Sequence, residues 1–463
     1  MKTGLTVWLP TVWLLCVAAV ARADERPNIV FLLADDLRWN TLGCMGDRIV
    51  QTPHIDGLAD AGVVFDSHFV TTSICSVSRA SILTGQHARR HGIVSFDTPF
   101  TAGQWADTYP ARLRAAGYRT GFVGKWGVGD TPPQVAAMAE HFDFWRGRPG
   151  QAGRLFIDPH DPTRTHATAK MGDEAVEFLA GCRAGRPFCL SVSFNAPHAR
   201  DGTPREFEPD DRDATLYADT VVPVPPTATD AFFRLLPPSV RRSISRTRWE
   251  LRFDTPDACQ RTLRDYYRLV SGIDREVGRI RAALAEHGLA ENTIIVLTSD
   301  NGFFFGERGL ADKWYLYEES VRTPLVVHDP RLPAARRGRR SPALTLNIDV
   351  APTLLDWAGV APPAGMQGCS LRPLVEHDAV PAGWRQEFYY EHVSVRDKIA
   401  ASEGIRTDRW TLIRWLDETP VVEELYDTAH DPLQERNLVA DPTQAATLAD
   451  LRSRLAALRE AAE

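Results

Sequence analysis

Five short apolar runs, each ending at a turn residue or a charge, constrain the fold of this chain more than any other feature. They read NIVFLLA, TGFVG, CLSVSF, TIIVLTS and PLVV, and they begin at Asn28, Thr120, Cys189, Thr293 and Pro324. Apolar side chains fill both alternating sets of positions, which is typical of strands buried on both faces. Such strands belong to mostly parallel sheets that helices cover on both sides.

A long amphipathic segment precedes the fourth run. Leucine, isoleucine and valine recur there at steps of three and four residues, at positions 269, 273, 277, 280 and 284, and a glycine at 288 supplies a stop. Strands that alternate with such helices predict an α/β fold with a large, mostly parallel sheet sandwiched by helices. In such sheets the chemistry collects at the carboxyl ends of the strands.

The N-terminal segment differs from the rest of the chain. Residues 1–23 have the features of a secretory signal peptide: an early lysine, an apolar run over residues 7–20, and small residues before the expected cleavage point. The run contains Pro10 and is short for a membrane span, so we expect no stable membrane anchor. The protein is therefore expected to be exported, either periplasmic or extracellular. An uncleaved N-terminal anchor is the alternative.

The pattern changes again after about residue 375. Short strand-like pieces, EFYYEHV, RWTLIRW and EELYD, precede a final helix from Pro442. We predict a large α/β domain over residues 24–375 and a small C-terminal antiparallel α+β subdomain over residues 376–463. The polar, proline-rich stretches 199–247 and 328–342 are expected to be surface insertions or connections.

Charge and cysteine content exclude some classes of function. The net charge of −7 and the pI near 6.0 make nucleic acid a poor partner. Six cysteines follow the signal segment without a CxxC pair, so no dense disulfide framework is expected, although Cys182 and Cys189 could bridge a short loop. Of 53 lysines and arginines only five are lysines, at positions 2, 125, 170, 313 and 398, so each lysine is informative.

Oxygen-bearing side chains follow two of the predicted strands directly. Asp35 and Asp36 end the first run, and Asp300 and Asn301 follow the fourth. Adjacent carboxylates repel one another unless a cation or arginines neutralise them. Taken alone, each pair could be a turn or a helix cap. Together they form an all-oxygen set that suits a hard divalent cation such as calcium, or magnesium in a tight cage.

The stretch SICSVSRASILTG carries a family signature. It contains Cys75, Arg79 four residues later, and the closing Leu-Thr-Gly at 83–85. With this signature the chain resembles the sulfatase family, whose fold is similar to that of alkaline phosphatase, from Pro27 to about Asn437. Val77 stands where the family usually has proline. The resemblance implies that a separate maturation enzyme oxidises Cys75 to formylglycine, and that the large domain is catalytic.

The resemblance also implies the roles of the metal site and of the reacting groups. A hydrated aldehyde at residue 75 attacks sulfur with one hydroxyl and later expels sulfate with the other. Asp300 and one calcium ion lower the pKa of the attacking hydroxyl, and Arg79 holds the hydrate. The calcium ligands implied are Asp35, Asp36, residue 75, Asp300 and Asn301.

Three further residues match family positions that contact the sulfate group or the leaving alcohol. Lys125 in GFVGKWGVG and Lys313 in LADKW match lysines that contact the sulfuryl oxygens. His198 in SVSFNAPHAR matches the general acid that protonates the leaving oxygen. The plainer alternatives are a buried structural thiol at Cys75, solvated surface lysines and a structural histidine.

One position departs from the family pattern. Members commonly read Gly-Lys-Trp-His-x-Gly, whereas this chain has Gly127 in place of the histidine. We predict that a polar group from another loop replaces its hydrogen bond to the hydrate and that the chain remains active.

The substrate implied is a sulfated glycan, or another sulfate ester. The likeness is to bacterial carbohydrate sulfatases, and the segment Tyr389 to Trp410 is an aromatic and charged loop suited to a sugar. Two alternatives remain: a phosphate or phosphonate monoester hydrolase with the same site, and a non-catalytic glycan-binding relative.

Overall fold

The computed structural model describes residues 26–150, 166–203 and 205–463. The predicted signal peptide over residues 1–23 lies outside these ranges. Within them, no helix combines the length and the apolar composition that a bilayer crossing requires.

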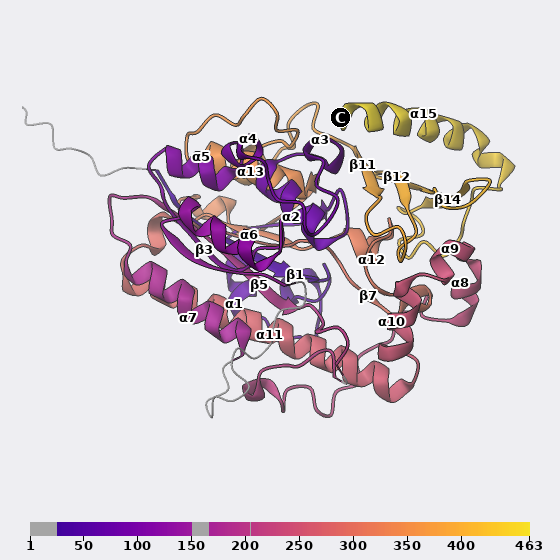
Figure 1. The fold of residues 1–463 in the computed structure, drawn as a ribbon, viewed down its shortest axis with the longest axis horizontal. Coiled ribbons are helices and arrows are strands. Elements are labelled where there is room, and N and C mark those ends of the chain that lie inside the picture. Colours follow the sequence, from indigo (N-terminus) through magenta and orange to yellow (C-terminus); the bar gives the residue numbers. More distant parts are fainter. Residues whose placement is uncertain (1–25, 151–165, 204) are drawn as a thin grey trace, which may run out of the picture.

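An eight-stranded sheet forms the centre of the molecule (Figure 1), in the order β10-β2-β9-β6-β1-β5-β3-β4. Its strands are β1 (Asn28–Asp35), β2 (Val63–Phe69), β3 (Arg119–Lys125), β4 (Phe144–Arg148), β5 (Phe188–Pro197), β6 (Thr293–Ser299), β9 (Leu325–His328) and β10 (Arg339–Leu346). All neighbours pair in parallel except β9, which runs antiparallel to β2 and β6. The predicted sheet of mostly parallel strands is confirmed, and all five apolar runs belong to it.

Helices cover both faces of this sheet (Figure 1). On one face lie α1 (Pro53–Asp60), α7 (Ala167–Ala180) and the long α11 (Pro256–Glu286); on the other lie α2 (Cys75–Thr84), α5 (Tyr109–Ala115) and α13 (Val350–Trp357). Side chains of β1 alternate between the two cores: Val30 and Leu32 pack beneath α7 and α11, and Phe31 packs with α2 and α5. The doubly apolar character of the first run thus reflects burial on both faces.

Shorter helices occupy the connections. They are α3 (Ala88–His91), α4 (Ala102–Ala106), α6 (Pro132–Ala137), α8 (Asp230–Leu235), α9 (Pro238–Arg241), α10 (Ile244–Arg252), α12 (Glu318–Val321) and α14 (Arg372–Glu376). The stretch 199–247 contains α8, α9 and the start of α10. The stretch 328–342 ends inside β10, which is an edge strand, and only an edge accommodates its Pro342 and its arginines without losing ladder hydrogen bonds.

A second, antiparallel sheet lies beside the first, in the order β11-β12-β13-β14. Its strands are β11 (Glu387–His392), β12 (Ser402–Thr407), β13 (Trp410–Trp415) and β14 (Val422–Asp427), and α15 (Ala445–Ala461) packs on one face. The expected small antiparallel part is confirmed. The expectation of one loop from Tyr389 to Trp410 is wrong, because residues 389–392 belong to β11, residues 402–407 form β12, and Trp410 begins β13.

Strand β12 escaped notice because its sequence, SEGIRT, is mostly polar. All six of its residues are nevertheless buried. Glu403 pairs with Arg414 of β13, and Arg406 pairs with Glu318 of α12. Partners that are distant in sequence thus make a buried polar strand possible.

The Cys182–Cys189 bridge does not form. Both thiols are free, and they belong to the hydrophobic cores on opposite faces of the sheet. The six cysteines that follow the signal segment are all free in the structure.

Candidate active site

Most of the predicted site residues lie at the carboxyl ends of four neighbouring strands of the large sheet. In the order β6-β1-β5-β3, the carboxyl ends deliver Asp300 and Asn301, then Asp35 and Asp36, then His198, then Lys125. Cys75 and Arg79 come from the start of α2, and Lys313 follows the short strand β8 (Ala311–Asp312). All of these residues are at most 3% exposed. The structure therefore brings together every residue that the sequence analysis nominated.

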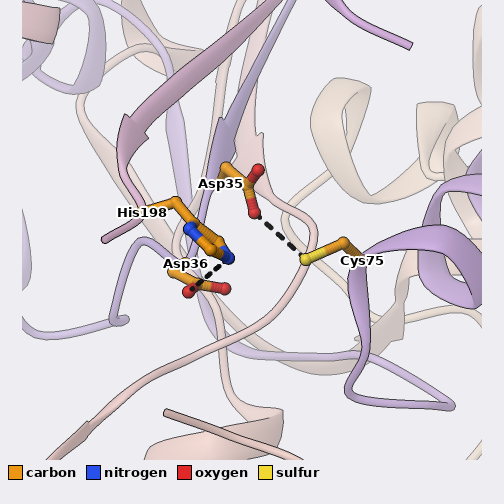
Figure 2. A group of neighbouring side chains, drawn as sticks. All are labelled: Asp35, Asp36, Cys75 and His198. Carbon is orange, nitrogen blue, oxygen red and sulfur yellow. Dashed lines mark hydrogen bonds and ion pairs between the residues drawn. The ribbon is translucent and has the colours of Figure 1, made fainter. Parts of the chain in front are cut away.

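Cys75 is the first residue of α2, and its thiol faces the end of β1 (Figure 2). Its Sγ lies 3.3 Å from Asp35 Oδ1. Burial, together with the Asp35 carboxylate, raises the pKa of this thiol well above its ordinary value. A thiol of this kind is a poor nucleophile, because the thiolate is the reactive form. The helix ends at Thr84, and the residue that caps it, Gly85, adopts a left-handed φ of 65°.

Ile74 and Val77 anchor the start of α2 in a cluster that includes Tyr390 of β11 and Trp415 of β13. The valine at 77 is therefore a buried apolar contact. The small sheet thereby holds the helix start, and with it Cys75, against the carboxyl ends of the large sheet.

Arg79 lies one turn after Cys75 and connects the carboxyl ends of four strands. Its Nε donates to Asp300 Oδ2 at 2.8 Å, and its Nη1 donates to the Lys125 carbonyl oxygen at 2.9 Å and to Ser193 Oγ at 2.5 Å. Its Nη2 lies 3.5 Å from Asp35 Oδ2. Arg79 thus neutralises two carboxylates at once. Ser193 of β5, which the sequence analysis did not nominate, helps to orient it.

The two lysines each pair with one aspartate of β1. Lys125 Nζ contacts Asp35 Oδ2, and Lys313 Nζ lies 2.5 Å from Asp36 Oδ1. Burial alone would lower the pKa of Lys125, but Asp35 and the other nearby acidic groups together raise it. Burial is outweighed in the same way at Lys313, where Asp36 is the foremost of the acidic groups that raise the pKa. Both lysines are therefore charged at neutral pH.

His198 lies between the aspartates and the cavity in front of them. Its Nδ1 donates to the Ala199 carbonyl oxygen at 2.6 Å, and its Nε2 lies 3.6 Å from Asp36 Oδ2. Burial lowers the pKa of His198 despite the nearby Asp36. The His198 ring is therefore neutral at neutral pH.

The carboxylates of the cluster influence one another's ionisation. Burial opposes the ionisation of Asp35, but the surrounding cationic groups, Lys125 foremost among them, together hold the pKa of Asp35 well below its usual range. Burial and the Asp35 charge raise the pKa of Asp300 to about 7. Three carboxylates, Asp35, Asp36 and Asp300, thus face three cations, Arg79, Lys125 and Lys313.

The donor set fits a hard cation. Ligand atoms of Asp35, Asp36, Cys75 and His198 lie within 4.8 Å of one another (Figure 2), and the Asn301 Oδ1 atom is buried without a hydrogen-bond partner. Asp300 stands at the edge of this group, since its oxygens accept from Arg79 and from the Asp36 backbone N–H. Asp36 also adopts a left-handed φ of 67°, a strained conformation of the kind found at functional sites.

Gly127 lies directly against Arg79. It has a φ of 79°, and a Cβ placed on it would lie 2.6 Å from Arg79 Cδ. Its N–H donates to Asp130 Oδ1 at 3.3 Å. A histidine at this position would therefore require Arg79 to move. The substitute polar group for the missing histidine remains a prediction.

A cavity of about 180 Å³ opens above Cys75. Besides Cys75, His198 and Lys313, its lining consists of Ile74, Phe96, Asp201, Ile244, Arg248, Trp314, Val395, Lys398 and Ile399. The sequence analysis named none of these nine residues as a site residue, because they lie on separate short elements. Val395, Lys398 and Ile399 nevertheless belong to the segment Tyr389 to Trp410, which it expected to suit a sugar. The scarcity of lysine also draws attention to Lys398.

Comparisons with known proteins agree with this geometry. A family model described as Sulfatase matches residues 27–360, and one described as N-sulphoglucosamine sulphohydrolase, C-terminal, matches residues 306–461. The chain is 30% identical to the N-acetylglucosamine-6-O-sulfatase of Bacteroides thetaiotaomicron, over 93% of this chain and 87% of that relative.

Two solved structures are similar over nearly their whole length. One is a complex of a protein with its substrate D-glucosamine-2-N,6-O-disulfate, with a TM-score of 0.78, 27% identity, and coverage of 94% of this chain and 98% of the other. The other is a phosphonate monoester hydrolase from Silicibacter pomeroyi, with a TM-score of 0.76, 25% identity, and coverage of 95% and 96%.

A parallel sheet with carboxylates, lysines and a helix-borne cysteine at its carboxyl edge defines an alkaline-phosphatase-like hydrolase. Within that class the chain belongs to the sulfatase family and is a sulfuric ester hydrolase.

Proposed function

We propose that this protein is an exported sulfatase that hydrolyses an O-sulfate ester of a carbohydrate, with formylglycine at residue 75 and one calcium ion. The observation that carries the proposal is the convergence of Cys75 with two buried lysine–aspartate pairs, below a cavity with His198 at its wall. Cys75 is the side chain that is modified in this proposal, and Lys125 and Lys313 beside it carry the fixed positive charge.

When formylglycine is present, its hydrate supplies the nucleophile that attacks sulfur. The surrounding residues have separate tasks. Lys125 and Lys313 provide fixed positive charge for the sulfuryl oxygens, which is most effective in a buried site. Arg79 orients Asp300 and holds the hydrate at residue 75. The same buried setting that makes the thiol unreactive excludes water from the reacting sulfur.

His198 is suited to donate a proton to the leaving oxygen. Its Nδ1 is held by the Ala199 carbonyl oxygen, so the ring is oriented with Nε2 toward the site. Substrate brings negative charge next to the ring and raises the pKa of His198, which favours the protonated form that a general acid needs.

Asp35, Asp36, residue 75, Asp300 and Asn301 would hold the calcium ion. Held by these residues, the ion would supply positive charge beside the sulfate and would lower the pKa of the attacking hydroxyl. It would also offset the carboxylates that Lys125 and Lys313 contact now, which leaves both ammonium groups available to the substrate.

The relatives favour a sulfated sugar. The Bacteroides relative is named for 6-O-sulfated N-acetylglucosamine, and one solved neighbour holds a disulfated glucosamine. A 6-O-sulfated glucosamine derivative is therefore the first substrate to test. The phosphonate monoester hydrolase neighbour supports a second candidate activity, on phosphate or phosphonate monoesters, with the same site.

The test combines mass spectrometry with kinetics. Protein made with a formylglycine-generating enzyme should carry an aldehyde in place of the thiol at residue 75 and should hydrolyse 6-O-sulfated glucosamines faster than matched phosphate monoesters. Cys75→Ala should abolish turnover and keep the fold. Equal activity of Cys75→Ala and the wild type would reject the mechanism, and faster phosphate hydrolysis would favour the second candidate.

A further inference from the structure

The floor and the outer wall of the cavity above Cys75 are formed by different residues. Its floor is the charged cluster with Cys75 and Lys313, and its outer wall comes from α10 and from the loop between β11 and β12, with Arg248 and Lys398. A substrate with its sulfate at the floor extends toward this outer wall. At about 180 Å³, the cavity is smaller than the pockets that enclose drug-sized ligands, roughly 300 Å³ or more. Substituents beyond the reacting ring therefore reach the mouth.

The cations around the cavity differ in how far they are neutralised. Lys313 pairs with Asp36, and Arg248 donates to Asp312 Oδ2 and to Asp201 Oδ2, each at 2.5 Å. Lys398 is exposed, and in the described part of the chain its ammonium makes no ion pair or hydrogen bond. It is thus the cation at this cavity that remains available to a ligand.

The backbone of Lys398 is nevertheless held in place. Its N–H donates to the Val395 carbonyl oxygen at 2.9 Å, and its own carbonyl oxygen accepts from Ile244 N–H at 2.9 Å. Lysine is also rare here: of the four lysines that the structure describes, Lys125 and Lys313 belong to the charged cluster, Lys398 lines its cavity, and Lys170 lies on α7.

We infer that Lys398 binds a second anionic group of the substrate, a sulfate or a carboxylate, so that the preferred substrate is a saccharide with at least two negative charges. The inference rests on the proposed function, which places the scissile sulfate at Cys75. Binding then neutralises a cation that has no partner in the free protein, whereas a neutral saccharide leaves it unpaired.

The test compares Lys398→Ala with wild type on three substrates: N-acetylglucosamine 6-sulfate, glucosamine 2-N,6-O-disulfate, and a 6-O-sulfated glucosamine joined to a uronic acid. A lysine–anion contact at an exposed position is worth roughly two- to tenfold in affinity. We expect Lys398→Ala to lower kcat/KM by this factor on a doubly charged substrate, through KM, and to leave the singly charged one unchanged. The disulfate and the uronate separate the two anion sources.

Arg396→Ala is the matched control, because Arg396 lies in the same loop, is 58% exposed and already pairs with Asp417. It should behave like wild type on all three substrates, and Lys398→Arg should retain the preference. Equal losses on singly and doubly charged substrates in Lys398→Ala, or a wild type without any preference for the second charge, would overturn the inference.

A binding measurement separates this inference from the proposed function. In a Cys75→Ala background, calorimetry with glucosamine 2-N,6-O-disulfate should show two- to tenfold weaker binding when Lys398→Ala is added. If formylglycine-containing wild type hydrolyses no sulfate ester but this difference persists, the proposed function fails and the anion site stands. If the difference is absent, the anion site is rejected whatever the activity.

Discussion

The side chains around Cys75 are arranged to stabilise negative charge on a bound group, and the thiol itself is poorly suited to react. Burial keeps it protonated, and Asp35 at 3.3 Å disfavours the thiolate further. An aldehyde at the same position has no such penalty, because its hydrate is neutral. This difference supports the proposal of formylglycine at residue 75.

His198→Ala tests the assignment of the general acid. A sugar hydroxyl is a poor leaving group and needs its proton in the transition state, whereas nitrophenolate leaves without one. General acid catalysis contributes about a hundred- to ten-thousandfold, so the kcat loss on a sugar sulfate should exceed the loss on 4-nitrophenyl sulfate by a comparable factor. Steady-state kinetics on both esters provide the comparison. Equal losses would show that His198 acts in another way, such as binding the metal with Asp35 and Asp36.

Gly127→Ala tests the contact between Gly127 and Arg79. The new Cβ would lie 2.6 Å from Arg79 Cδ and displace the guanidinium that holds Asp300. Misplacement of a catalytic group by about 1 Å costs up to roughly a hundredfold, so we expect kcat to fall ten- to a hundredfold. For the same reason Gly127→His should lower activity, although it restores the residue that family members commonly have at this position.

Gly92→Ala is the control for the backbone. Gly92 has a φ of 68°, and nothing lies within 4 Å of its missing Cβ. Both alanines therefore carry the cost of the left-handed backbone, about 1 kcal/mol or more, but only the one at 127 meets Arg79. Similar kcat values in the two variants would show that the contact with Arg79 has no catalytic consequence.

At the scale of elements, α10 connects the segment that carries Lys313 with the loop that follows His198. Arg252 donates to Asp312 Oδ1 at 2.5 Å, to Glu206 Oε2 at 2.6 Å and to Asp201 Oδ1 at 3.1 Å. Asp312 and Trp314, the neighbours of Lys313, both have positive φ, at 66° and 91°. This strained turn persists because the ion pairs from α10 hold it.

Arg252→Ala should destabilise the fold and reduce turnover together. It leaves the buried Asp312 and Glu206 without this partner, and breaking a buried ion pair from one side costs roughly 3 to 5 kcal/mol. Denaturant unfolding measures the loss, and kcat on a sulfated sugar should fall because Lys313 is no longer held.

Arg234→Ala is the comparison, because the Arg234–Asp230 pair on α8 is about three-quarters exposed on both sides. Its effect on the free energy of unfolding should stay within about 0.5 kcal/mol. If Arg252→Ala were as stable as Arg234→Ala, the ion pairs of α10 would not hold the Lys313 segment.

For the whole molecule, the site joins the centre of the large sheet to the small one. The carboxyl edges of β6, β1, β5 and β3 supply the charged groups, and the small sheet packs against the start of α2 (Figure 1). The three cations at least balance the three carboxylates, since the pKa of Asp300 is raised to about 7, so a bound dication would leave net positive charge for a sulfate. We therefore expect metal binding and substrate binding to support each other.

Removal of divalent metal tests this expectation. Chelation should abolish turnover and lower the Tm, calcium should restore both, and the Tm should rise with calcium concentration as binding to the native state requires. The double variant Asp36→Asn/Asn301→Ala should lose the calcium-dependent rise in Tm. Metal analysis of active protein that finds no divalent ion, or stoichiometric zinc, would contradict the assignment.

The layered α/β architecture and the residues that gather in the charged cluster could be predicted from the sequence alone. Apolar runs such as NIVFLLA follow from burial on both faces, and the residues that follow them must meet at one edge because parallel strands end on the same side. The sequence could not determine β12, whose polar residues are buried with partners on β13 and α12. Nor could it show that Cys182 and Cys189 lie on opposite faces of the sheet.

The surroundings of this cluster could be seen only once the chain was folded. The contact between Gly127 and Arg79, the hold of α10 on the Lys313 segment, and the place of Lys398 at the mouth all join residues that are far apart in the chain. Local patterns carry periodicity, which reflects burial, but they do not carry the distances between elements. Those distances depend on how the two sheets pack against each other. The substrate that the cavity accepts depends on the same packing.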